Sequence, residues 1–138
     1  MSKKAPISDV MTQQVIVANI NNKFSQFMEF FNTWRIQHMP VTMGNTLVGI
    51  LSINDLLGFL YRQLSEGKPV DNATLDSQFD VQTVMTLDPV TIAPNDSIEK
   101  AFNILAEGKF QALPVVSEGK LVGIITNKDM VRLYPNLI

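Results

Sequence analysis

The sequence predicts a mixed α/β (α+β) fold built from two copies of one unit of about 50 residues, each ordered strand, helix, strand, strand, helix. Three observations lead to this prediction. The chain matches itself when it is shifted by 74 positions, each copy carries one helical stripe of apolar residues, and each copy carries two β-prone runs that flank a turn. A single unit is too small to bury both faces of its sheet, so we expect the two copies to pack sheet to sheet.

The repeat runs without a gap from Val10 to about Leu60. At this offset the following segments coincide: Val10-Met11-Thr12 with Val84-Met85-Thr86, Pro40-Val41 with Pro114-Val115, Leu47-Val48-Gly49-Ile50 with Leu121-Val122-Gly123-Ile124, and Asp55 with Asp129. We therefore expect a first repeat at 7–62 and a second repeat at 81–138, which together form one compact module. Residues 63–80, which are mostly polar and contain Gly67, Pro69, Asp71 and Asn72, are expected to be a linker.

A short strand and an amphipathic helix open each copy. The β-prone runs are Val-Ile-Val at 15–17 and Val-Thr-Ile at 90–92. In the second copy, Asp96 or Ser97 is a suitable N-cap and Gly108 is a suitable stop. The apolar stripe has helical spacing, and we assign it to the core: Ile98, Ala101, Phe102 and Leu105, matched by Phe24, Phe27, Met28 and Phe31 in the first copy.

A hairpin and a second helix complete each copy. The predicted turns contain Gly44-Asn45 and Glu118-Gly119, because glycine and asparagine accept the positive φ that tight hairpin turns require. The second helix is expected to begin near Ser52 in the first copy and near Thr126 in the second.

The composition excludes several classes of protein. Hydrophobic residues make up 46% of the chain and charged residues 17%, which favours an ordered core over disorder. The net charge is -2 without a lysine-arginine run, so no nucleic-acid partner is expected. The absence of cysteine excludes disulfides and thiolate metal sites. We find no apolar run for a signal peptide or a membrane span, and expect a cytoplasmic protein with no membrane partner.

No motif points to an enzyme. The chain has no Walker-type glycine loop, no histidine pair for zinc and no nucleophile motif, so we expect no catalytic residue, no metal and no obligatory cofactor.

Both hairpins end in one sequence motif: Gly, two apolar residues, Ser or Thr, two variable residues and Asp, at 49–55 and 123–129. In a structural interpretation, Ser52 and Thr126 are N-caps, and Asp55 and Asp129 complete capping boxes. In a functional interpretation, the helix N-terminus suits phosphate, and the carboxylate accepts both hydroxyls of a ribose. Two copies of the motif, each after a matched hairpin, strengthen the functional interpretation. Both interpretations remain open.

The order of elements, the Val-Met-Thr opening, the Pro-Val strand start and this ending resemble the cystathionine-β-synthase-type (CBS) domain over nearly the whole chain. The resemblance implies a stand-alone tandem CBS pair whose repeats pack around a pseudo-two-fold axis, and it implies a homodimer. In such pairs, clefts between the repeats hold AMP, ADP, ATP or S-adenosylmethionine as regulatory ligands. The Asp takes the ribose hydroxyls, and the Ser or Thr lies near the phosphate.

The resemblance assigns two ligand clefts. The first comprises Ile16, Val17, His38, Met39, Pro40, Ser52 and Asp55, and the second comprises Val90, Thr91, Ala112, Leu113, Pro114, Thr126, Lys128 and Asp129. We expect the second cleft to bind first, because it offers a polar Thr91 and a Lys128 that can meet phosphate. His38 stands where such proteins often carry a basic residue facing phosphate, and the alternative is a surface or hydrogen-bonded histidine.

Two functional hypotheses follow. In the first, the chain is a regulatory sensor of adenine nucleotides or S-adenosylmethionine that acts on an unknown effector protein in trans. In the second, it is a ligand-independent dimeric scaffold for protein interaction. The polar Ser52/Asp55 and Thr126/Asp129 pairs favour the sensor, whereas the bulky Ile53 in the first motif and the poorly basic first cleft keep the scaffold open.

Overall fold

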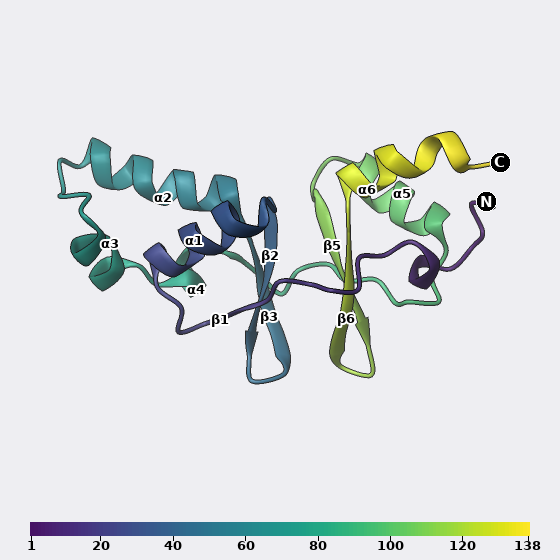
Figure 1. Cartoon of the computed structure of the whole chain (residues 1–138), viewed down its shortest axis with the longest axis horizontal. Coiled ribbons are helices and arrows are strands. Elements are labelled where there is room, and N and C mark those ends of the chain that lie inside the picture. The colour runs from purple at the N-terminus through teal and green to yellow at the C-terminus, as the bar shows by residue number, and fades with distance from the viewer. The chain divides into compact units, whose positions relative to one another are not determined.

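Each repeat folds around one antiparallel hairpin, as Figure 1 shows. The strand pairing leaves two residues in each turn. In the computed structural model, which describes residues 1–138, β2 (His38–Met43) pairs with β3 (Thr46–Ser52), and β5 (Ala112–Ser117) pairs with β6 (Lys120–Thr126). The backbone φ is 61° at Gly44, 51° at Glu118 and 77° at Gly119. Gly44 and Gly119 therefore adopt the predicted positive φ, whereas Asn45 does not, and Glu118 adopts it although it is neither glycine nor asparagine.

The chain divides into two compact units that differ from the two sequence repeats. One unit consists of residues 16–88, and the other consists of residues 1–15 and 89–138. The difference arises because each Val-Met-Thr opening pairs with the hairpin of the other repeat. Thr86 of β4 (Thr86–Leu87) pairs with Ile50 of β3, and Thr12 forms a bridge with Ile124 of β6.

The unit of residues 16–88 contains a four-stranded sheet of order β1-β2-β3-β4. The strand β1 (Ala18–Asn19) is parallel to β2, and the other neighbours are antiparallel. Four helices accompany the sheet: α1 (Phe24–Trp34), α2 (Ile53–Ser65), α3 (Asn72–Gln78) and α4 (Val81–Val84). Phe24, Phe59 and Phe79 join α1, α2 and the end of α3 in the core, with ring centroids 5.1 to 5.7 Å apart.

The other unit joins the N-terminal segment to the second hairpin. It contains a 3-10 turn η1 (Ile7–Asp9), the helices α5 (Ile98–Ala106) and α6 (Asn127–Leu133), and a final 3-10 turn η2 (Tyr134–Asn136). The Ile7 amide donates to the Asp96 carbonyl at 2.8 Å, and the Ile98 amide donates to the Ala5 carbonyl at 2.9 Å. These bonds hold the N-terminal segment at the start of α5, and Ile7 is fully buried in the core of this unit.

The predicted helical stripes are confirmed as core. Phe24, Phe27 and Phe31 of α1 are buried, and so are Ile98, Ala101 and Leu105 of α5, while Met28 and Phe102 are partly buried and pack against these cores. Ser97 is the N-cap of α5 and accepts from the Lys100 amide at 3.1 Å. No helix has the length and apolar character that crossing a bilayer requires.

The predicted first strands are displaced along the chain. The first strand lies at Ala18–Asn19 rather than at 15–17, and its counterpart is a single bridge between Ile92 and Val115. Ala18 and Ile92 are 74 positions apart, and each is 3% exposed. The pairing therefore follows the inward side chain that both repeats share, rather than the β-propensity of the run at 15–17.

The predicted linker at 63–80 contains regular structure. The helix α2 continues to Ser65, and α3 follows after a short connection. Leu75 of α3 is 2% exposed in the core. Asp76 of α3 accepts from the Ser25 amide at 2.8 Å and from the Ser25 hydroxyl at 2.7 Å. The buried Leu75 and the bonds from Ser25 of α1 to Asp76 therefore hold this segment against the core, although its composition is mostly polar.

The close approach of the exchanged openings predicts a stability effect at two glycines. A Cβ added at Gly49 would lie 2.5 Å from the Met85 sulfur, and one added at Gly123 would lie 2.5 Å from the Met11 sulfur. We expect Gly49→Ala and Gly123→Ala each to lower the free energy of unfolding by about 1–3 kcal/mol in urea denaturation, because the added methyl overpacks the contact.

Gly58→Ala is the matched control. A Cβ at Gly58 meets only the Arg62 Nη1, at 3.5 Å, so alanine should leave the stability unchanged or raise it by about 0.5–1 kcal/mol through helix propensity. Equal stability of Gly49→Ala and Gly58→Ala would contradict the close approach.

The docking of α3 predicts a pH dependence. The Ser25 amide and then the Ser25 hydroxyl lower the pKa of Asp76 below its usual 3.8. A carboxyl pKa that is lower in the folded state contributes stability at pH values above the unfolded pKa, and this contribution is lost as the pH falls through the lowered folded pKa. We expect Asp76→Asn to be less stable than the parent by about 1 kcal/mol at pH 7, with a difference that shrinks below pH 3.8.

Urea titrations of both proteins between pH 2 and pH 7 measure this difference, with Glu29→Gln as a control for loss of an acidic charge on α1. A constant difference across the range would contradict the assignment to the Asp76 charge.

Candidate functional site

In each unit, the predicted ligand residues converge on one end of the hairpin. The start of β2 faces the end of β3, so that His38 pairs with Ser52 in register. Because β1 is parallel to β2, with Ala18 beside Val41, residues 16–17 lie at the same end. The second hairpin repeats this arrangement: Ala112 pairs with Thr126, and the parallel bridge from Ile92 to Val115 brings residues 90–91 to that end.

A capping box connects the first hairpin to α2. The Ser52 hydroxyl accepts from the Asp55 amide at 3.1 Å, and Asp55 Oδ2 accepts from the Ser52 amide at 2.8 Å. The hairpin also continues into the helix, because the Ile53 amide donates to the Gln37 carbonyl at 2.9 Å. This arrangement fixes both side chains, and Asp55 Oδ1 takes part in neither capping bond.

The second repeat contains the same capping box. The Thr126 hydroxyl accepts from the Asp129 amide at 3.3 Å, and Asp129 Oδ2 accepts from the Thr126 amide at 2.9 Å. Asp129 Oδ2 also lies 3.1 Å from the Thr126 hydroxyl. The structural interpretation of the shared motif is therefore confirmed in both copies, and again only one carboxylate oxygen takes part in the capping bonds.

The predicted cleft residues differ in what they can offer a ligand. Met39 and Leu113 are fully buried in the two cores, so only their backbone can face a ligand. Pro40, Ala112 and Pro114 are also buried, whereas Ile16 and His38 are half-buried. Val17, Val90, Thr91 and Lys128 are exposed, and the four capping residues are half-buried.

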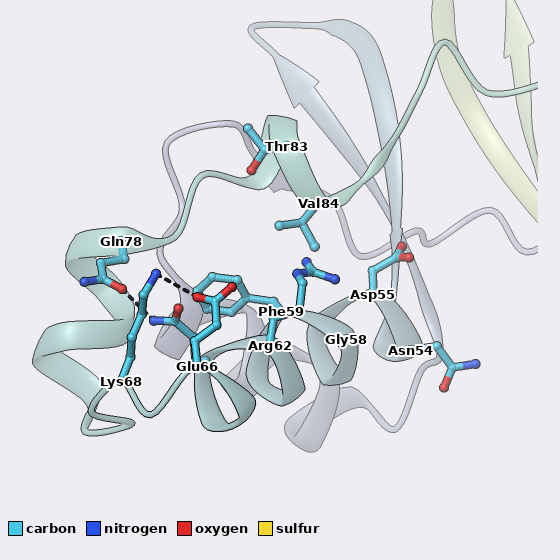
Figure 2. Close-up of a pocket in the computed structure, with 11 residues that line it drawn as sticks. Asn54, Asp55, Gly58, Phe59, Arg62, Glu66, Lys68, Gln78, Thr83 and Val84 are labelled. Atoms are coloured by element: carbon cyan, nitrogen blue, oxygen red, sulfur yellow. Dashed lines mark hydrogen bonds and ion pairs between the residues drawn. The ribbon is translucent and has the colours of Figure 1, made fainter.

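A groove opens beside the first capping box, within the unit of residues 16–88. It has a volume of about 920 Å³ and runs along α2 from Asp55, with Thr83 and Val84 of α4 on the opposite wall, as Figure 2 shows. The remaining lining residues are Asn54, Gly58, Phe59, Arg62, Gln63, Glu66, Lys68 and Gln78. Of the seven residues of the predicted first cleft, only Asp55 lines this groove.

Hydrogen bonds and one ion pair order the far end of the groove. The Gln63 side-chain nitrogen Nε2 donates to the Gln78 side-chain oxygen Oε1 at 2.6 Å, and Lys68 Nζ lies 2.9 Å from Glu66 Oε2. Gln63 is 4% exposed, so this bond satisfies a buried polar group and ties α2 to α3. No group of histidine, cysteine and acidic side chains is placed to hold a metal ion.

Sequence analysis missed most of this groove. No repeated motif contains Arg62, Lys68 or Thr83. Their side chains line one groove only after α3 and α4 fold back along α2. A weak signal was the glycine at position 58, inside an otherwise regular helix, where a missing side chain often has a packing or functional reason.

These features define a module of two α/β repeats, each with a helix that begins in a Ser/Thr–Asp capping box at the open end of a hairpin. The model of the CBS domain matches residues 7–62 and 81–136, and the chain belongs to this family. The uncharacterized protein MJ1225 of Methanocaldococcus jannaschii is 26% identical over 93% of this chain, which spans 42% of that protein. The CBS domain-containing protein YhcV of Bacillus subtilis is 27% identical over 90% of this chain and 81% of its own length.

A solved structure gives the same fold with a ligand. The structure of CBSX2 from Arabidopsis thaliana in complex with AMP has a TM-score of 0.77 and 28% identity, covering 96% of this chain and 97% of CBSX2. The predicted mixed α/β fold of two CBS repeats is thereby confirmed.

Proposed function

We propose that the chain is a regulatory module that binds an adenine nucleotide or S-adenosylmethionine and acts on a partner protein. One observation carries the proposal. In both repeats, the capping box uses one oxygen of the Asp55 or Asp129 carboxylate and leaves the other outside the capping bonds. A ribose can donate both hydroxyls to such a fixed carboxylate without breaking the helix cap.

Two further observations support the proposal. The hairpin register brings Ile16 and Val17 to the same sheet end as Ser52 and Asp55, so that apolar and polar groups are available together for a nucleoside. CBSX2, which has the same fold over nearly its whole length, was solved with AMP.

Regulation requires that the ligand bind one state of the module better than another. The two units are each built from parts of both repeats, because the openings are exchanged. The groove beside Asp55 is lined by Val84 of the exchanged opening as well as by α2, so a ligand in it would contact both repeats, and a change there can be passed to a partner protein.

The capping geometry predicts that ligand binding and stability can be separated. We expect Asp129→Ala to weaken binding at its site by about tenfold or more, because a bond to a charged group contributes about 1.5–3 kcal/mol. The same variant should lose only the stability of a helix cap, about 1 kcal/mol. Calorimetric titration with AMP, ADP, ATP and S-adenosylmethionine, beside urea denaturation, measures both quantities.

Ser97→Ala is the matched control, because it removes the N-cap of α5 outside either predicted cleft. It should cost similar stability and leave affinity unchanged. Asp55→Ala tests the first repeat in the same way. Full affinity in both Asp55→Ala and Asp129→Ala would argue against the ribose role and favour the scaffold hypothesis.

An exposed apolar stripe on α2 supports the homodimer that the family resemblance implies. Leu57, Tyr61 and Leu64 are 54%, 69% and 58% exposed, and their spacing places them on one face of the helix. In the second repeat, Val131, at the position equivalent to Leu57, is 73% exposed. A second copy of the chain would bury this surface, which is otherwise costly to expose.

We therefore expect Tyr61→Glu to convert the homodimer to a monomer in light scattering coupled to size exclusion, because a charge would be buried without a partner. Met43→Glu at the tip of the first hairpin, where Met43 is 56% exposed, should leave the dimer intact. A Tyr61→Glu protein that stays dimeric would place the interface elsewhere.

A further inference from the structure

The groove beside Asp55 contains a cation without an ionic partner. Of its two basic side chains, Lys68 pairs with Glu66 at 2.9 Å, whereas the Arg62 guanidinium takes part in none of the ion pairs of the chain. Figure 2 shows the guanidinium on the side of α2 that faces Val84, inside the groove. An anion that entered the groove would therefore meet a charge that needs no other bond to be broken.

Gly58 determines where that charge lies. Side chains on a helix lean toward its N-terminus, so the Arg62 side chain runs back over the preceding turn. A Cβ added at Gly58 would lie 3.5 Å from Arg62 Nη1, which places the guanidinium directly over the glycine. Asp55 lies three residues before Gly58, which is a rise of about 4.5 Å toward the N-terminus of the helix.

We propose that Arg62 binds the phosphate of a nucleoside monophosphate whose ribose hydroxyls are held by Asp55. The phosphate then lies on the groove side of Asp55, and not beside Ser52, where the family resemblance would place it. This assignment rests on the proposed function and specifies the ligand class of its first site. Asp55 and Arg62 line the same groove and form no ion pair with each other, so a sugar phosphate can lie between them. The volume of about 920 Å³ is within the range of small-molecule sites, and a guanidinium can donate two parallel bonds to a phosphate.

The second repeat lacks this arrangement. At the offset of 74, the positions of Gly58 and Arg62 are taken by Arg132 and Asn136. Arg132 occupies the place where Gly58 leaves space, and Asn136 lies in the final 3-10 turn and carries no charge. The Arg62 contact to phosphate is therefore a property of the first repeat, and the two sites differ in what they require of the ligand.

The test compares a nucleotide with its nucleoside. The full chain carrying Asp129→Ala, in which only the first site keeps its carboxylate, is titrated with AMP and with adenosine by calorimetry. Adding Arg62→Gln should lower the AMP affinity by about tenfold or more and leave the adenosine affinity unchanged, because only AMP carries the anion. Lys109→Gln is the matched control for loss of one positive charge, and it should change neither affinity, since Lys109 is exposed and lies outside the groove.

Each other outcome overturns the assignment in a different way. Equal AMP affinity with and without Arg62, lost in Asp55→Ala, would remove Arg62 and leave the proposed function in place. Loss of all AMP binding in Asp129→Ala would show that the first repeat holds no nucleotide. If the unaltered chain binds neither AMP, ATP nor S-adenosylmethionine, the proposed function and this assignment fail together. Thermal melting tests whether the Arg62→Gln protein is folded, which the exposed position of Arg62 predicts.

Discussion

The capping box at the end of each hairpin is the interaction on which the local fold and the candidate site both depend. It ends a strand, begins a helix and fixes an Asp carboxylate within one turn of the chain. The amides of Ser52 and Asp55 would otherwise lack an acceptor at the helix start. Since the box engages only one oxygen of each Asp, folding leaves a charged acceptor in a defined place. The structural and functional interpretations of the shared motif at the hairpin ends are therefore compatible.

The exchange of the Val-Met-Thr openings gives the chain its second constraint. Each opening supplies a pairing segment to the hairpin of the other repeat, and a glycine in that hairpin lets a methionine approach. Neither repeat can therefore form its complete unit from its own sequence alone. This coupling explains why the two sequence repeats and the two compact units have different boundaries. It also means that a change at one site involves chain segments from both repeats.

What the sequence predicts well is local. The hairpin turns, the apolar stripes and the capping residues depend on neighbours within a few positions, and these predictions agree with the structure. The helix α3 was missed because its anchor, the bond from Ser25 to Asp76, joins residues 51 positions apart. Met39 and Leu113 were assigned to clefts by resemblance, and their side chains are fully buried within runs of consecutive buried residues in β2 and β5. The groove needed α2, α3 and α4 together, and no short pattern contains all three.

The helix α2 shows how one element can serve three purposes without conflict. Leu56 and Phe59 face the core, Asp55 and Arg62 face the groove, and the exposed stripe at Leu57, Tyr61 and Leu64 occupies the remaining flank. A period of 3.6 residues per turn separates these faces around the axis, so each can vary without disturbing the others. The counterpart α6 shares the capping box and the exposed apolar position, but it has arginine in place of the groove glycine. Duplication has thus kept what folding requires in both copies, while the residues that would contact a phosphate have diverged.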